Sequence, residues 1–232
     1  MDSSAVDAQL VDRLESVDAR IAEAARAAGR DPGEITRIVV TKFHPVSLVE
    51  ALYALGVRDV GENRQQELSA KADALGGLEG MRWHFIGQAQ TNKARAIRTA
   101  ASVVHSVDRV RIAEALDAAS DGDPLDVLLQ VNLTDDQGRG GVAPVEVDAL
   151  AEGVAALATL RIRGVMAVAP LDENPARAFE RLADSARRVR RVVPEADWIS
   201  AGMTADFPEA ISMGATHLRI GSAITGPRPT RG

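Results

Sequence analysis

The chain has 232 residues, of which 46% are hydrophobic and 26% are charged, a composition typical of one large globular domain or two small ones. Its net charge of −6 argues against a nucleic-acid surface, and the lack of cysteine excludes disulfides, thiolate metal sites and cysteine nucleophiles. The acidic N-terminus and the absence of an apolar run of roughly 20 residues argue against a signal peptide and a membrane span, so we expect a cytoplasmic protein.

The first 30 residues predict an amphipathic helix that ends near Gly29. Apolar side chains recur at helical spacing, at Leu10, Leu14, Val17 and Ile21, while the opposite face is charged. Glycine favours the end of a helix. We expect this helix to be an addition to the main fold.

Short β-branched runs alternate with longer amphipathic stretches over the rest of the chain. Each predicted helix separates two predicted strands, as parallel pairing requires. The predicted strands are 36–42, 59–63, 82–87, 103–107, 125–132, 161–169, 197–202 and 217–222. The predicted helices are 46–55, 63–75, 91–100, 109–119, 144–158, 175–192 and 205–213.

This alternation predicts an α/β fold, a single (β/α)8 TIM barrel that covers residues 1–232, with residues 1–30 as an extra N-terminal helix packed on the barrel. An open doubly-wound sheet is the rival. No G-x-G-x-x-G follows the first predicted strand, so the dinucleotide fingerprint of that fold is missing. The turn-rich stretch 132–144 is interpreted as a loop over the barrel mouth.

Polar residues mark the C-terminal ends of the predicted strands, where such barrels carry their chemistry. Strands 1 and 8 become neighbours when the barrel closes, so Lys42 and Arg219 are candidates for one site. Lys42 is one of only three lysines among 27 basic residues, and an amine, unlike a guanidinium, can attack a carbonyl. The polar strand ends are Lys42, Asn63, His84, Ser106 with Asp108, Asn132, Met166, Ser200 and Arg219.

Two glycine-bearing segments, "SAGMTADF" (200–207) and "RIGSAITG" (219–226), follow predicted strands 7 and 8. Loops at these positions commonly bind phosphate through backbone amides and hydroxyls. A phosphate site beside an arginine and a lysine suits pyridoxal 5′-phosphate, with Lys42 as the Schiff-base amine. An arginine beside the pyridine nitrogen donates its proton poorly, which disfavours extensive carbanion chemistry.

Simpler interpretations exist for each of these residues. Lys42 could be merely solvated, Arg219 could form an ion pair inside the barrel, and Ser200 and Thr204 could cap a helix. His84 is interpreted as a packing residue, because no acid that would orient it is identifiable. The run "RRVRR" (187–191) is interpreted as a salt-bridged helix face, with acids at Glu180 and Asp184, and the histidines are too scattered for a metal site.

From residue 35 onward, the chain resembles the pyridoxal phosphate homeostasis proteins, which are similar to the barrel domain of alanine racemase without its second domain. The resemblance is carried by "VVTKFHP", "VGENRQQE", "WHFIGQAQTNKAR", "VHSVDR", "LLQVNLTDDQGRGGV", "IRGVMAVAP", "SAGMTADFPEAI" and "LRIGSAITGPR". It implies that Lys42 holds the cofactor as an imine and that Arg219 approaches the pyridine nitrogen. It implies phosphate contacts from Ser200, Thr204, Gly221 and Ser222, further cofactor contacts from Gly202 and Met203, and a pocket lined by Asn63, His84, Asn132 and Met166.

Three functions remain open at this point. The first is a monomeric, non-catalytic carrier of pyridoxal phosphate that supplies apo-enzymes, without metal, nucleic-acid or membrane partners. The second is a pyridoxal phosphate-dependent racemase or lyase with an exposed site; the chain ends soon after strand 8, and Tyr53, its only tyrosine, falls in the first barrel helix. The third is a barrel that binds another phosphorylated aldehyde or ketone through the same lysine.

Overall fold

The computed structural model describes residues 8–134 and 136–228 and contains a closed barrel of eight parallel strands in sequence order. Strands β1 and β8 pair directly, with Ile38 opposite Arg219, and this pairing closes the barrel. The TIM barrel predicted from the sequence is confirmed. The strands are β1 Thr36–Val40, β2 Asp59–Glu62, β3 Arg82–Phe85, β4 Val103–Val107, β5 Leu125–Gln130, β6 Leu160–Met166, β7 Trp198–Ser200 and β8 His217–Ile220.

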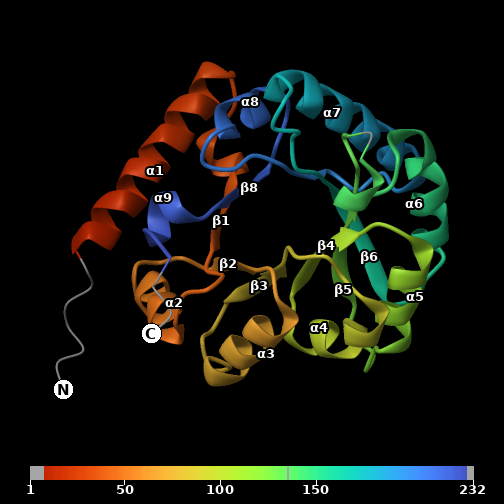
Figure 1. Ribbon diagram of the computed structural model, residues 1–232, viewed down its shortest axis with the longest axis horizontal. Coiled ribbons are helices and arrows are strands. Elements are labelled where there is room, and N and C mark those ends of the chain that lie inside the picture. Colours follow the sequence, from red (N-terminus) through yellow and green to blue (C-terminus); the bar gives the residue numbers. More distant parts are fainter. Residues whose placement is uncertain (1–7, 135, 229–232) are drawn as a thin grey trace.

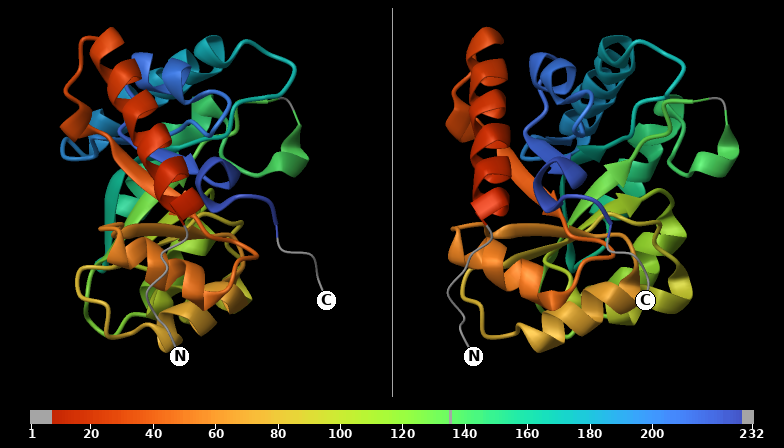
Figure 2. Two further views of the ribbon diagram at one scale, coloured as in Figure 1. Left: turned by 90° about the vertical axis from the view of Figure 1, so that its left-hand side faces the viewer. Right: turned by 60° about the vertical axis from the view of Figure 1, so that its left-hand side comes forward.

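Helices surround the strands and form the outer layer of the barrel (Figure 1). The added N-terminal helix α1 runs along the outside of β1 and contacts α8 and α9, as both figures show (Figures 1 and 2). The predicted helix within residues 1–30 is therefore confirmed over the described residues. The helices are α1 Ala8–Ala27, α2 Val46–Ala54, α3 Gln65–Ala74, α4 Ala94–Ala100, α5 Val110–Ala118, α6 Val147–Ala155, α7 Pro175–Val192, α8 Phe207–Ser212 and α9 Ser222–Thr225.

The C-terminal ends of most predicted strands were placed one to three residues too late. The first strand ends at Val40 and not at residue 42, and the sixth ends at Met166 and not at residue 169. The apolar sequence continues beyond the last paired residue of the strand, because residues such as Ala167 and Ala169 remain buried in the loop that follows. Several polar strand ends named from the sequence therefore lie in loops at the barrel mouth.

The strands separate two buried regions, one between the barrel and the surrounding helices and one inside the barrel. Outward-facing side chains such as Leu218, Ile220, Trp83 and Phe85 pack against the helices in the main apolar core. The alternation read in strand 8 is thereby confirmed, because Arg219 lies between the two apolar residues and faces inward. Inside the barrel, a small apolar cluster of Val103, Leu128 and Met166 lies beside a set of buried polar side chains.

Three of the four arginines in the basic run on α7 pair with nearby acids. Arg187 pairs with Asp184, as the sequence indicates, while Arg188 and Arg191 pair with Asp148 of α6. In the described part of the chain, no helix is long and apolar enough to cross a membrane. Nor do the described residues contain a group of three or more histidines, aspartates or glutamates placed to hold a metal ion.

Candidate functional site

A cavity of about 530 Å³ opens at the C-terminal ends of the strands, between the loops that follow β1, β7 and β8. Seven of the twelve residues proposed from the sequence lie around it, although they come from four separate segments of the chain. The predicted proximity of Lys42 and Arg219 is thus a feature of the structure. The seven residues are Lys42, Asn63, Met203, Thr204, Arg219, Gly221 and Ser222.

Lys42 lies in the turn directly after β1. Val40, two residues earlier, lines the same cavity, as the alternation along a strand predicts. The next residue, Phe43, has a φ of 70°, and it is the only described residue other than glycine with a positive φ. Lys42 is half-buried and makes no hydrogen bond or ion pair with the described part of the protein. Its amine is therefore available to a ligand in the cavity.

Arg219 is held rigidly at the base of the cavity, with only 5% of its surface exposed. Its Nη1 donates to Ser200 Oγ at 2.6 Å, and its Nη2 donates to the carbonyl oxygen of Ala167 at 2.8 Å. Burial lowers the pKa of Arg219 to about 10. The guanidinium consequently remains charged at neutral pH and acts there only as a hydrogen-bond donor.

A chain of buried hydrogen bonds continues from Ser200 across the barrel interior. Ser200 Oγ lies 3.0 Å from Nδ1 of His105, whose Nε2 lies 2.9 Å from Nδ1 of His84. The Nε2 of His84 lies 2.8 Å from the carboxylate of Asp59. The chain therefore links the cavity to a carboxylate at the start of β2.

The two ends of this chain determine the direction of every bond in it. Asp59 accepts, so His84 carries its proton on Nε2 and accepts at Nδ1 from the Nε2–H of His105. His105 then accepts at Nδ1 from the Ser200 hydroxyl, whose oxygen accepts from Arg219. Both imidazoles are neutral in this arrangement. Burial supports this state, because it lowers the pKa of His84 and lowers that of His105 further.

We expect these buried histidines to make the ligand-free protein less stable in acid. Burial lowers the pKa of His84 and His105, and lowers that of His217 to about 3, whereas all three take up protons near pH 6.5 when unfolded. The unfolded chain therefore binds more protons below about pH 6.5. From pH 7.5 to pH 5, the free energy of unfolding should fall by about 2 kcal/mol from His217 alone.

Urea denaturation at the two pH values measures this difference. A His105→Asn variant serves as the control and should show a smaller difference, because one of the titrating groups has been removed. Equal free energies of unfolding at both pH values in the unmodified chain would contradict the neutral hydrogen-bonded chain.

The loops after β7 and β8 supply hydroxyls and free amides to the cavity. The side chains of Thr204 and Ser222 line it, and the backbone N–H groups of Thr204 and Gly221 donate to no other group in the described residues. The cavity also contains the basic residues Lys42, Arg219 and Arg228, and none of the described residues that line it is an aspartate or glutamate. This wall is suited to an anionic ligand.

Ser200 does not line the cavity; its side-chain oxygen accepts a hydrogen bond from Arg219 behind the cavity wall. It is fully buried and does not cap α8, which has no side-chain cap. In the loop before α8, the carboxylate of Asp206 accepts from the Met203 amide at 2.6 Å. Gly202, with a φ of 92°, also lies outside the cavity, and a Cβ there would lie 2.8 Å from Ala210. The structure therefore favours structural roles for these two residues in place of the direct contacts that the sequence suggested.

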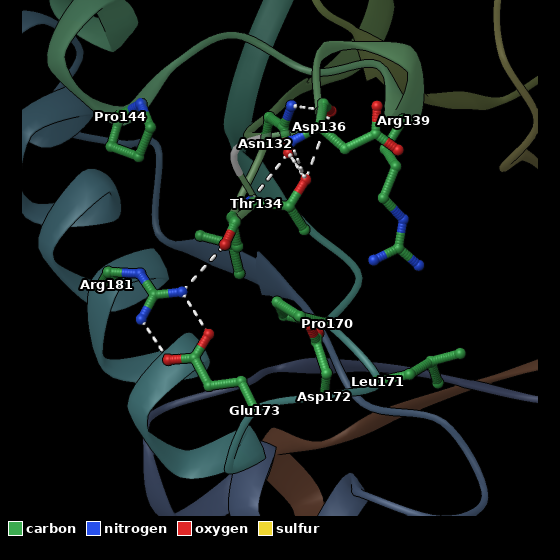
Figure 3. Close-up of a pocket in the computed structure, with 11 residues that line it drawn as sticks. Asn132, Thr134, Asp136, Arg139, Pro144, Pro170, Leu171, Asp172, Glu173 and Arg181 are labelled. Carbon is green, nitrogen blue, oxygen red and sulfur yellow. Dashed lines mark hydrogen bonds and ion pairs between the residues drawn. The ribbon is translucent and has the colours of Figure 1, made fainter.

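Three further predicted residues are also placed elsewhere. His84 is fully buried below the cavity, and Met166 packs in the barrel interior with Val103 and Leu128. Asn132 lines a second cavity of about 800 Å³, where it accepts a hydrogen bond from Thr134 (Figure 3). That cavity is formed by the loop 132–144, and Arg181 on its far side pairs with Glu173. The loop thus forms the wall of a separate cavity.

Several residues that shape the site were not predicted from the sequence. Asp59 is the acid that orients His84, and finding it required the register between β2 and β3. Gly87 lines the cavity at a point where a Cβ would lie 1.9 Å from the carbonyl oxygen of Asn63, so only glycine permits this approach. The motif "WHFIG" contained this glycine, but sequence alone does not show which backbone it meets. The other missed cavity residues include Phe43, His44 and Arg228.

The chain resembles known proteins in both sequence and structure. The family model for the alanine racemase N-terminal domain matches residues 13–229. The pyridoxal phosphate homeostasis protein of Mycobacterium bovis is 40% identical, over 97% of this chain and 95% of that protein. The protein of the same name from Pseudomonas aeruginosa is 42% identical, over 94% of this chain and 96% of that protein.

Among solved structures, PipY of Synechococcus elongatus with pyridoxal phosphate bound has a TM-score of 0.78 and 34% identity. The match covers 89% of this chain and all of that one. The curated relatives are named as homeostasis proteins and not as enzymes. On the family match and these identities, the chain belongs to the alanine racemase N-terminal domain family and, within it, to the pyridoxal phosphate homeostasis proteins.

Proposed function

We propose that this protein binds pyridoxal 5′-phosphate as a Schiff base on Lys42 and takes part in its homeostasis as a carrier. The observation that carries the proposal is the cavity that combines an unpaired Lys42 with a buried Arg219 and an acid-free wall. The names of the relatives and the pyridoxal phosphate complex of PipY support the same ligand. When bound, the cofactor supplies an aldehyde that reacts reversibly with amines.

The donor set of the cavity fits this cofactor. Asn63 has a buried side-chain oxygen without a hydrogen-bond partner, which a hydroxyl group on a ligand would satisfy. Thr204, Gly221 and Ser222 would hold the phosphate through hydroxyl and amide groups. Arg219 would face the pyridine nitrogen with one of its remaining N–H groups, because Ser200 and Ala167 accept from only two of its five donors.

Several features favour a carrier over a catalyst. Arg219 remains charged and donates its proton poorly, so a ring nitrogen beside it stays neutral and the cofactor is a weak electron sink. Tyr53, the only tyrosine, lies on α2 and does not line the cavity. Its hydroxyl donates a hydrogen bond to the carbonyl oxygen of Glu79. We propose a cytoplasmic, single-domain monomer that releases its cofactor to apo-enzymes.

Borohydride reduction of the loaded protein, followed by peptide mass spectrometry, tests the proposal directly. We expect one reduced pyridoxyl phosphate adduct, on Lys42, and no adduct on Lys71 or Lys93. Lys71 is buried and paired with Glu62, whereas Lys93 lies outside the cavity. An adduct on another residue, or one whose mass corresponds to a different aldehyde or ketone, would overturn the assignment.

The racemase or lyase alternative is tested on the same preparation. The loaded protein is incubated with single-enantiomer amino acids while optical rotation and exchange of the α-proton are followed. A carrier should exchange α-protons no faster than free cofactor does, because Tyr53 lies outside the cavity and none of the described lining residues is an aspartate or glutamate that could act as a second base. Turnover well above that rate would replace the carrier proposal with an enzyme.

A further inference from the structure

The turn that carries Lys42, residues 41–44, is held by side chains from β2 and α3 that do not themselves line the cavity. Lys71 Nζ donates to the carbonyl oxygen of Thr41 at 2.8 Å. On the other side of Lys42, the amide of Phe43 donates to Glu67 Oε2 at 2.8 Å. The peptide groups that flank Lys42 are therefore both fixed by charged side chains.

Lys71 is itself fixed by a buried ion pair. Its Nζ lies 2.6 Å from Glu62 Oε1, and the side chains are 6% and 0% exposed, respectively. Thr41 Oγ1 donates to the same carboxylate oxygen at 2.6 Å. The two groups that accept from the Lys71 ammonium are thus the carbonyl of this turn and the carboxylate that also holds the turn.

The turn requires such support because its backbone is strained. A phenylalanine at a φ of 70° is disfavoured by contact between its Cβ and the backbone, and such conformations persist only where the surroundings impose them. The guanidinium groups of Arg64 and Arg228 lie 5.0 and 4.4 Å from the centre of the Phe43 ring, respectively. The ring contacts add to the hydrogen bond that Glu67 accepts.

A buried ion pair is weak evidence for a role in stability, because apolar residues of similar volume often replace such pairs without loss. The geometry of the Glu62–Lys71 pair is better explained by its hydrogen bonds to Thr41 in the turn. Glu67 and Lys71 lie one helical turn apart on α3, so a single face of this helix contacts the turn on both sides of Lys42.

We propose that Glu67 and the Glu62–Lys71 ion pair are positioning residues that direct the Lys42 amine into the cavity. This inference rests on the proposed function, since it concerns how Lys42 meets the aldehyde. A misdirected amine would remain reactive toward small reagents but would meet a ligand bound at the phosphate loops less often. The positioning residues should therefore affect the rate of adduct formation more than the accessibility of the amine.

The test compares Glu67→Ala with Glu67→Gln, because glutamine keeps an acceptor for the Phe43 amide. Lys71→Met is compared with Lys93→Met, which makes the same chemical change at a lysine outside the cavity. Borohydride trapping at limiting pyridoxal phosphate gives the rate of adduct formation on Lys42. Reductive methylation of the cofactor-free chain gives the accessibility of the same amine.

We expect Glu67→Ala and Lys71→Met to slow adduct formation about tenfold, the effect of losing one hydrogen bond to a charged group. Glu67→Gln and Lys93→Met should stay within about twofold of the unmodified chain, and methylation of Lys42 should change as little in all four. Equal rates in Glu67→Ala and the unmodified chain would overturn the inference, as would equal slowing in Glu67→Gln and Glu67→Ala. Should Lys71→Met fail to fold, the Glu67 pair decides alone.

The outcome separates this inference from the proposed function. An unmodified chain that forms no adduct on Lys42 overturns the proposed function itself. An unmodified chain that forms the adduct, together with variants that form it equally fast, overturns only the positioning role.

Discussion

Replacement of Lys42 by alanine is expected to abolish the covalent adduct with pyridoxal 5′-phosphate and to weaken its retention on the order of a hundredfold. Lys42 is the only lysine that lines the cavity, and it has no competing partner among the described residues. The visible absorbance of the purified protein, before and after gel filtration, measures the loss. The phosphate loops should still bind the cofactor reversibly, because they do not depend on the amine.

Lys93→Ala is the matched control, since Lys93 lies in the connection between β3 and α4 and does not line the cavity. It should leave both the absorbance and the retention unchanged. Two results together would show that the cavity does not select Lys42. The absorbance would persist in Lys42→Ala, and borohydride would trap the cofactor on a second lysine. Loss of retention without loss of absorbance would likewise contradict a covalent anchor.

The architecture follows from local signals that the sequence displays fully. Eight β-branched runs separated by amphipathic stretches predict the barrel, and closure of any such barrel makes the first and last strands neighbours. The prediction that Lys42 and Arg219 share a site needed only this closure and the alternation along each strand. The structure shows the pairing of Ile38 with Arg219 that brings the two together.

Interactions that depend on register or on contact between a helix and a strand could not be predicted in this way. Asp59 reaches His84 because β2 and β3 pair Gly61 with His84, and a shift of one residue would turn either side chain to the other face. Lys71 reaches the turn after β1 from a helix whose rotation is determined by packing. In the sequence, Lys71 looks like any solvated lysine, because its burial is a tertiary property.

Ser200 shows how a position at a strand end can suggest a contact other than the one in the structure. A serine before a glycine and a helix is typical both of a phosphate loop and of a helix cap, but the structure turns its hydroxyl toward Arg219 and His105. The direction of a side chain at a strand end depends on twist, which the pattern does not contain. We therefore expect Ser200 to affect cofactor binding through the position of the Arg219 guanidinium.

Replacement of Arg219 by methionine is expected to weaken cofactor retention by about ten- to a hundredfold, the range for losing a charge-assisted hydrogen bond. Ser200→Ala should cause a smaller loss, because it removes only the acceptor that holds Nη1 in place. Arg139→Met, at an exposed arginine of the second cavity, is the control and should have no effect. Equilibrium dialysis with pyridoxal phosphate measures all three.

The comparison of pyridoxal phosphate with pyridoxal, which lacks the phosphate, distinguishes the two roles that Ser200 can have. If Ser200 acts through Arg219, its replacement weakens the binding of both compounds by the same factor, because both present the same ring nitrogen. Thr204→Ala should instead weaken only the phosphate ester, since Thr204 lines the cavity in the loop after β7, where we propose that the phosphate binds. A loss in Ser200→Ala that is confined to the phosphate ester would return Ser200 to the phosphate site and contradict the hydrogen-bonded chain as the support of Arg219.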